Sequence, residues 1–215
     1  MSFQSQDFLE LRYREMVGRF GKSPSTRLCN YILLETEDYY VTPSLGSITS
    51  NWVLVWPRSS FLNCRAWLGS NEEIHDLSKQ VHSKLAPRNS DDYVWFEHGS
   101  QNIGSIVGCG IDFAHLHLLI DPQFSFKKFQ NTVRNSNKIE WETLDAPRTS
   151  GVNLETEYHI FGNSSQGFLA EESTNLGSQF FRRVISRITN NEDCWDYRSH
   201  SFNGNIKNTI SNLTV

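Results

Sequence analysis

The chain has 215 residues and a formal net charge of −4 at pH 7, so its composition indicates no electrostatic surface for nucleic acid or an anionic membrane. It is long enough to bury a hydrophobic core without disulfide bonds or a structural metal to hold it together. Its four cysteines form no C-x-x-C pair, which argues against a thiol-ligated zinc site. The N-terminus is polar and no apolar run approaches membrane-spanning length, so we expect a cytoplasmic protein with no membrane partner.

The first half of the chain mixes helical and strand patterns. Apolar residues at helical spacing predict a helix over residues 7–20, which glycine, serine and proline then end. A capping box at Ser70 and Glu73 predicts a second helix through about residue 85. Short connections between the apolar runs indicate antiparallel pairing. Strands are predicted at residues 31–34, 39–42, 52–56 and 93–97.

The second half becomes polar after Asp121, and we predict loops with one weak helix at residues 126–133. Two short apolar runs, at 158–161 and 167–170, predict a hairpin. The next helix begins at about Ser178, which we interpret as its N-cap in preference to a phosphate contact. Its predicted outward, solvated face carries Arg182, Arg183 and Arg187.

The most informative stretch runs from Gly108 to Ile120, where two histidines stand two residues apart inside an apolar run. This spacing is typical of a strand, in which alternate side chains share a face. The predicted faces are Phe113, His115, His117 and Leu119 on one side, and Ala114, Leu116, Leu118 and Ile120 on the other.

Three interpretations fit two histidines on one face of a strand. They can be ordinary core residues, or they can share a zinc ion, although no other histidine stands at a recognisable ligand spacing. The third is covalent catalysis, in which one imidazole attacks a phosphate and a second protonates the leaving oxygen. This one explains the preceding glycines, because backbone N–H groups of Gly108, Cys109 and Gly110 can approach a phosphate closely.

The stretch resembles the motif of the histidine triad (HIT) superfamily of nucleotide hydrolases and transferases, His-φ-His-φ-His-φ-φ, where φ is apolar. The overlay places Phe113 at the first histidine, His115 at the middle one and His117 at the last. Bacterial members often read Asp-His-Ala-His-Leu-His, from which residues 112–117 differ at one position. Residues 34–46, 53–58 and 96–99 are also similar to segments of the family.

The resemblance implies an α+β fold, with an antiparallel sheet, packed helices and a C-terminal extension. It implies a nucleotide hydrolase or nucleotidyltransferase that acts at the α-phosphate through a nucleotidyl-histidine intermediate on His115. His117 would assist the leaving group, and the backbone of Gly108, Cys109 and Gly110 would hold phosphate oxygens. The partner would be a nucleotide or nucleotide conjugate, with no metal site and no required cofactor, although a divalent cation can accompany a polyphosphate substrate. A homodimer is also implied.

Two further residues are candidates for the nucleotide site. His98 ends a predicted strand in Glu97-His98-Gly99, where it either faces the phosphates or is a buried turn histidine. Gln166 lies in the glycine-flanked turn of the predicted hairpin. We divide the chain into an N-terminal helix and linker (1–27), a HIT-like nucleotide-binding domain (28–122) and a C-terminal extension packed on that domain (123–215).

The sequence departs from the family pattern at two positions. Phe113 replaces the first histidine, which supports the nucleophile, and Ser60 stands where the family pattern Pro-Lys-x-His ends in histidine. Loss of such support can cost about 10- to 100-fold in activity. The alternative function is therefore a catalytically degenerate nucleotide-binding HIT-like protein.

Overall fold

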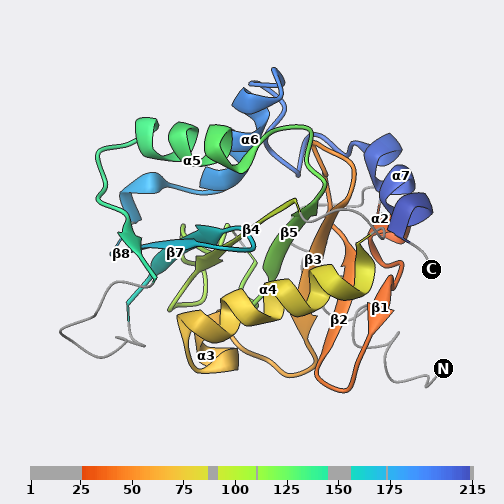
Figure 1. The fold of residues 1–215 in the computed structure, drawn as a ribbon, viewed down its shortest axis with the longest axis horizontal. Helices are drawn as coiled ribbons and strands as arrows, with labels where there is room; N and C mark the ends of the chain where they lie inside the picture. Colours follow the sequence, from red (N-terminus) through yellow and green to blue (C-terminus); the bar gives the residue numbers. More distant parts are fainter. Residues whose placement is uncertain (1–25, 87–91, 110, 145–155, 173, 214–215) are drawn as a thin grey trace.

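A computed structural model of the protein describes residues 26–86, 92–109, 111–144, 156–172 and 174–213. In this part of the chain, eight strands form one antiparallel sheet in the order β1-β2-β3-β5-β4-β7-β8-β6 (Figure 1). The strands are β1 (Leu34–Glu35), β2 (Tyr39–Pro43), β3 (Trp52–Pro57), β4 (Tyr93–Gly99), β5 (Leu116–Ile120), β6 (Glu142–Thr143), β7 (Tyr158–Gly162) and β8 (Gly167–Glu171). The helices are α2 (Thr26–Cys29), α3 (Cys64–Leu68), α4 (Asn71–Leu85), α5 (Phe126–Asn135), the 3-10 turn η1 (Thr174–Leu176), α6 (Phe180–Ile188) and α7 (Asn203–Leu213).

The predicted α+β class, with an antiparallel sheet and packed helices, is confirmed. The hairpin predicted at residues 158–161 and 167–170 is β7 and β8, and the weak helix is α5. The strand predicted at 31–34 is reduced to β1, and the C-terminal tail, which carried no prediction, contains α7. The helix predicted at 7–20 lies outside the described residues.

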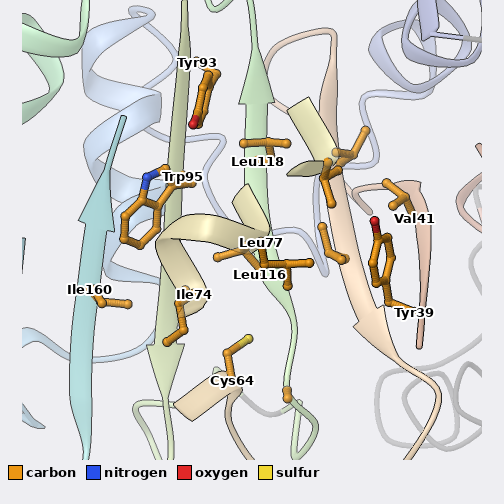
Figure 2. Packing of buried hydrophobic residues seen from close by; sticks show 14 of the residues in the cluster. Tyr39, Val41, Cys64, Ile74, Leu77, Tyr93, Trp95, Leu116, Leu118 and Ile160 are labelled. Carbon is orange, nitrogen blue, oxygen red and sulfur yellow. The ribbon is translucent and has the colours of Figure 1, made fainter. Parts of the chain in front are cut away.

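Helix α4 begins where the sequence predicts. The Ser70 hydroxyl accepts a hydrogen bond from the Glu73 N–H at 3.1 Å, so the cap satisfies one of the donors at the start of the helix. One stripe of α4, which includes Ile74 and Leu77, is buried against the sheet, and the helix crosses in front of the strands in Figure 1. Figure 2 shows these side chains over Leu116 and Leu118 of β5 and Trp95 of β4.

The opposite face of the sheet carries a second core. Leu119 of β5 and Trp52 of β3 pack there with an aromatic cluster that includes Phe129 of α5 and Phe181 of α6. The predicted alternation along the histidine stretch therefore holds over the strand itself. However, β5 begins at Leu116, so Phe113 and His115 lie just before the strand and not within it.

Residues on both sides of the predicted boundary at 122 share the sheet. β7 pairs with β4, with His98 opposite His159, so the segment from Tyr158 to Glu171 continues the sheet that begins at Leu34. The predicted division at residue 122 therefore crosses a continuous sheet. In the described part of the chain, no helix combines the length and apolar character needed to cross a membrane.

Candidate active site

A pocket that is open to solvent lies on the sheet face opposite α4. The sheet and the segment before β5 contribute its central residues, and the loop and helix of the C-terminal part contribute a wall. The central residues are Thr42, Leu54, Trp56, His98, His115 and His117, and the wall residues are Gln179, Arg182 and Tyr197. The structure thus brings His115, His117, His98 and Cys109, all predicted from the sequence, to one pocket.

His115 is held in a single orientation by its backbone neighbour. Its Nδ1 lies 2.7 Å from the carbonyl oxygen of Phe113, and its ring stacks on Trp56 with 5.2 Å between centroids. Burial lowers the pKa of His115, so the imidazole is neutral at pH 7. Since a carbonyl only accepts, we assign the proton to Nδ1, which leaves the lone pair on Nε2. His115 therefore has the tautomer that a nucleophile acting through Nε2 requires.

This bond changes the meaning of the first departure from the family pattern. The sequence associates Phe113 with lost support of the nucleophile, but it is the Phe113 backbone carbonyl that bonds to His115. A backbone carbonyl is present whichever side chain occupies the position. Ser60, the second departure, is exposed beyond the end of β3 and is not among the residues that line the pocket.

His117 has the opposite arrangement. The indole N–H of Trp52 donates to His117 Nδ1 at 3.0 Å, and the imidazole stacks on Phe96 with 4.5 Å between centroids. Burial lowers the pKa of His117 well below its usual value, and the charges of His115, His98 and Arg182 lower it further. Because Nδ1 accepts from the indole, the proton of neutral His117 is on Nε2. The ring centroids of His115 and His117 lie 4.9 Å apart. His115 offers a lone pair on Nε2, and His117 offers an N–H group.

His98 lies inside β4 and not in a turn, and it lines the pocket. Its Nε2 accepts a long hydrogen bond, at 3.5 Å, from the Phe181 N–H, so its proton is assigned to Nδ1. That Nδ1 is buried and has no hydrogen-bond partner among the described residues. Burial, and then the charge of His159, lowers the pKa of His98 well below its usual value. His98 is thus an unpaired buried donor beside the other two histidines.

His159 continues the histidine row on β7. Its ring centroid lies 5.2 Å from that of His98 and 5.7 Å from that of Phe181, and its side chain is fully buried. Burial lowers the pKa of His159 to about 3, so it stays neutral throughout the ordinary pH range. His159 packs behind the pocket and does not line it.

The glycine turn before β5 is only partly described. Gly110 lies outside the described residues, and Gly108, whose carbonyl accepts from the Ile111 N–H at 2.9 Å, is not among the pocket-lining residues. Cys109 lines the pocket with a left-handed backbone, φ 58°, and its N–H donates to the Ile106 carbonyl at 3.2 Å. The predicted phosphate contacts of this turn therefore stay predictions, and binding through the Cys109 N–H would require that bond to open.

Gln166 is not brought to the pocket. It lies in the turn between β7 and β8, where its N–H donates to the Asn163 side-chain oxygen at 3.0 Å. The Asn163 carbonyl also accepts from the Trp95 indole, and Trp95 belongs to the core under α4. The described geometry therefore gives Gln166 a turn-forming contact.

The start of α6 differs from the prediction. The N-cap is Gln179 and not Ser178, in a left-handed conformation with φ 55° and with no side-chain capping bond. The Gln179 side chain instead donates to Asp196 at 2.9 Å and accepts from the Tyr197 N–H at 3.3 Å. These bonds tie the chain after α6 to the pocket wall.

Arg182 is the main residue that sequence reasoning misplaced. We predicted an outward, solvated side chain, but Arg182 is 3% exposed and lines the pocket. Its guanidinium donates to the carbonyls of Trp195 and Leu45, at 2.9 and 3.3 Å, and also to that of Gly46. It lies 4.8 Å from the centre of the Trp52 ring.

Within the described part of the chain, no ion pair neutralises the charge of Arg182. No carboxylate of the described residues lies within 4 Å of its nitrogens, although Asp196 and Tyr197 are near enough to influence its pKa. Burial lowers that pKa to about 10, so the side chain is still a cation at pH 7. The available signal in the sequence was weak, since almost every position of α6 turns out to be buried.

Metal ligation has no built site in this region. Among the described residues, no three His, Cys, Asp or Glu side chains are grouped so that they would hold a metal ion. The row of histidines is instead arranged by an indole, a backbone carbonyl and aromatic stacking.

Comparison with known proteins leaves the family open. No protein-family model matches the chain, and no curated protein sequence matches it. Among solved structures, yeast Ap4A phosphorylase Apa2, in complex with Ap4A, overlaps 69% of this chain and 64% of its own, with 13% identity and a TM-score of 0.42. The overlap thus spans less than two thirds of that protein, and at this TM-score it carries no argument about function.

Proposed function

We propose that the protein is a nucleotide hydrolase or nucleotidyltransferase of the histidine triad type, which acts at the α-phosphate through His115. The observation that carries the proposal is the pair of opposite Nδ1 partners in one pocket, a carbonyl acceptor for His115 and an indole donor for His117. His115 is neutral with its lone pair on Nε2, and His117 is neutral with its proton on Nε2. Two histidines kept only for packing would not need opposite partners on Nδ1.

The chemistry divides into two displacements at phosphorus. In the first, His115 Nε2 attacks the α-phosphorus, the N–P bond forms, and the bond to the bridging oxygen breaks. The leaving group departs with the electron pair of that bond, while His117 Nε2–H donates a hydrogen bond to the bridging oxygen. In the second, water or another acceptor attacks phosphorus, the N–P bond breaks, and the acceptor loses its proton to solvent. The products are His115 in its original form and the transferred nucleoside monophosphate.

The pocket supports a nucleotide as the ligand. It is mainly apolar, and Trp56 and Pro57 lie at the end where His115 stands, where a base and sugar would find flat apolar surface. Phe113 at the first motif position does not argue against activity, because its carbonyl makes the supporting bond. A homodimer remains a prediction from the resemblance.

Trapping the intermediate tests the proposal. Wild type, His115→Ala and His117→Ala would be mixed with nucleoside phosphoramidates and dinucleoside polyphosphates carrying different bases, and intact masses recorded within seconds. We expect turnover by the wild type, an accumulating adduct with His117→Ala, and neither with His115→Ala. His200→Ala, outside the pocket-lining residues, is the control and should turn over like the wild type.

The rival is a binding module without catalysis. It predicts nucleotide binding with no adduct and no turnover across the whole panel. The rival would also leave nucleotide affinity nearly unchanged in His115→Ala, because a pocket without chemistry has no requirement for the Nε2 lone pair.

A further inference from the structure

We infer that the Arg182 end of the pocket is a subsite for a negatively charged leaving group of the phosphate class. The inference rests on the proposed function, because it concerns the part of the substrate that departs when His115 attacks. It names a chemical class for that part and the residues that recognise it, Arg182 and His98.

The first argument is the uncompensated charge. Arg182 is buried, donates only to backbone carbonyls, and has no carboxylate within ion-pair distance among the described residues. A buried cation without a counter-charge is costly, and carbonyl dipoles offset only part of that cost. An anion bound in the pocket would supply the missing charge.

The second argument is the direction in which the side chains are arranged. On β3, Trp56 stacks on His115, Leu54 pairs with His117, and Trp52 bonds to His117. The guanidinium of Arg182 lies over the Trp52 ring, at the far end of this row from Trp56. With the nucleoside at the Trp56 end and His117 beside the bridging oxygen, whatever is attached to that oxygen extends toward Arg182.

The third argument is the unpaired donor on His98. Its Nδ1 is buried and has no partner among the described residues, and the residue is 5% exposed and lines the pocket. Its ring centroid lies 5.9 Å from that of His117, so His98 is a neighbour of the histidine that we assign to the bridging oxygen. An oxyanion in the pocket could accept from this N–H group and also balance the charge of Arg182, whereas a neutral acceptor could do only the first.

The state of His117 agrees with this assignment. A neutral imidazole offers a hydrogen bond but is a poor proton donor, so it suits a leaving group that is stable as an anion. A phosphate leaving group departs without taking a proton, whereas an amine must take one. The site therefore favours phosphate over nitrogen as the departing group.

The test compares leaving groups on the same nucleoside monophosphate. Substrates with a polyphosphate leaving group would be compared with the p-nitrophenyl ester, whose leaving group lacks the phosphate charge. We expect Arg182→Met to lower kcat/KM about 10- to 100-fold on the polyphosphates and to change it little on the ester. Arg187→Met, the same substitution on an exposed position of α6, should leave both unchanged. An equal loss on both substrates, or no loss, would overturn the inference.

Direct binding keeps the inference separate from the catalytic proposal. Inorganic tripolyphosphate would be titrated into wild type, Arg182→Met, Arg182→Lys and Arg187→Met, with folding checked by circular dichroism. We expect binding to the wild type and Arg187→Met, weaker binding to Arg182→Lys, which keeps only a point charge, and about 10- to 100-fold weaker binding to Arg182→Met.

If Arg182→Met does not fold, the Lys variant decides the question. Affinity for tripolyphosphate that is unchanged in Arg182→Lys, or absent in the wild type, contradicts the subsite. If no nucleotide forms an adduct while tripolyphosphate binding depends on Arg182, the catalytic proposal fails and the anion subsite stands.

Discussion

On the face of β5 that α4 covers, Leu116 and Leu118 are fully buried in an apolar cluster; on the opposite face, His115 and His117 are almost as buried but line an open pocket. Both faces are formed by the five residues of β5 and by His115, which directly precedes them. Since alternate side chains of a strand point to opposite sides, one short segment can build the core and the site at once. Stability and chemistry are thereby separated by the alternation and not by distance along the chain.

Two buried arginines of the described chain, Arg65 and Arg182, show the same contrast. Arg65 forms an ion pair with Glu171 at 3.2 Å and lies over the Tyr158 ring at 3.9 Å. Arg182 lies over an aromatic ring too, but bonds to carbonyls alone. The first charge is balanced within the protein, whereas the second is the one that we propose a ligand balances. The following substitutions separate the two regions further.

The largest expected effect is on stability, from a substitution on the face of β5 that α4 covers. Leu118→Ala should lower the free energy of unfolding by about 2–5 kcal/mol, because it removes buried methyl groups and leaves a cavity under α4. Urea denaturation gives the value, and Ile103→Ala, at a side chain 75% exposed, should cost less than about 0.5 kcal/mol. If Leu118→Ala abolished turnover while stability was retained, the separation of the two faces would be wrong.

The second-largest effect is expected from acid, which should lower the free energy of unfolding through His159, on the face of the sheet that carries the pocket. The pKa of His159 is lowered to about 3, below its ordinary value of 6.5, so its contribution is present above pH 6.5 and is lost as pH falls toward 3. Between those values the unfolded chain binds one more proton at this residue. His159→Phe should therefore reduce the slope of unfolding free energy against pH by about 1.4 kcal/mol per unit near pH 5. A slope equal to that of the wild type would show that His159 is not buried in its neutral form.

A smaller effect is expected from Trp52→Phe, which removes the donor to His117 Nδ1. The ring would then populate both tautomers, and we expect kcat/KM to fall roughly fivefold, the equivalent of about 1 kcal/mol for one hydrogen bond. Nitrogen-15 chemical shifts of His117 report the tautomer directly. Trp95→Phe, on the opposite face, is the control and should leave those shifts in place. Unchanged shifts in Trp52→Phe would exclude the indole as the positioning group.

The smallest effect is expected at the first motif position. Phe113→His should leave turnover close to the wild-type value, because the backbone carbonyl already fixes His115. Steady-state kinetics on the best substrate of the panel would measure it. A gain of about tenfold or more would mean that the missing side chain limits the reaction after all.

Much of the fold could be predicted from the periodic spacing of apolar residues. The alternation around His115 and His117 predicted which side chains share a face, and the capping box predicted the start of α4. Local signals of this kind are available because burial repeats every two residues in a strand and every 3.6 in a helix. The order of the strands was not predicted, since pairing such as that of β7 with β4 joins segments far apart in the chain.

The wall of the pocket could not be predicted for the same reason. Arg182 is buried because residues from the β2–β3 turn, from Trp52 and from Trp195 surround it, and no local pattern records that meeting. The role of the Phe113 carbonyl was hidden as well, because a sequence records side chains and this contact belongs to the backbone. The burial of Arg182 depends on tertiary contacts, whereas the Phe113 carbonyl lies only two residues from His115 and was missed because it belongs to the backbone.

The central claim is that His115 is the group that becomes covalently modified. Wild-type protein would be mixed with a dinucleoside polyphosphate, quenched in alkali because the N–P bond hydrolyses in acid, digested and sequenced by tandem mass spectrometry. The account predicts the mass of a nucleoside monophosphate on His115 and its absence from the same peptide of His115→Ala. The same mass on His117, on Cys109 or on no residue of a protein that turns the substrate over would contradict it.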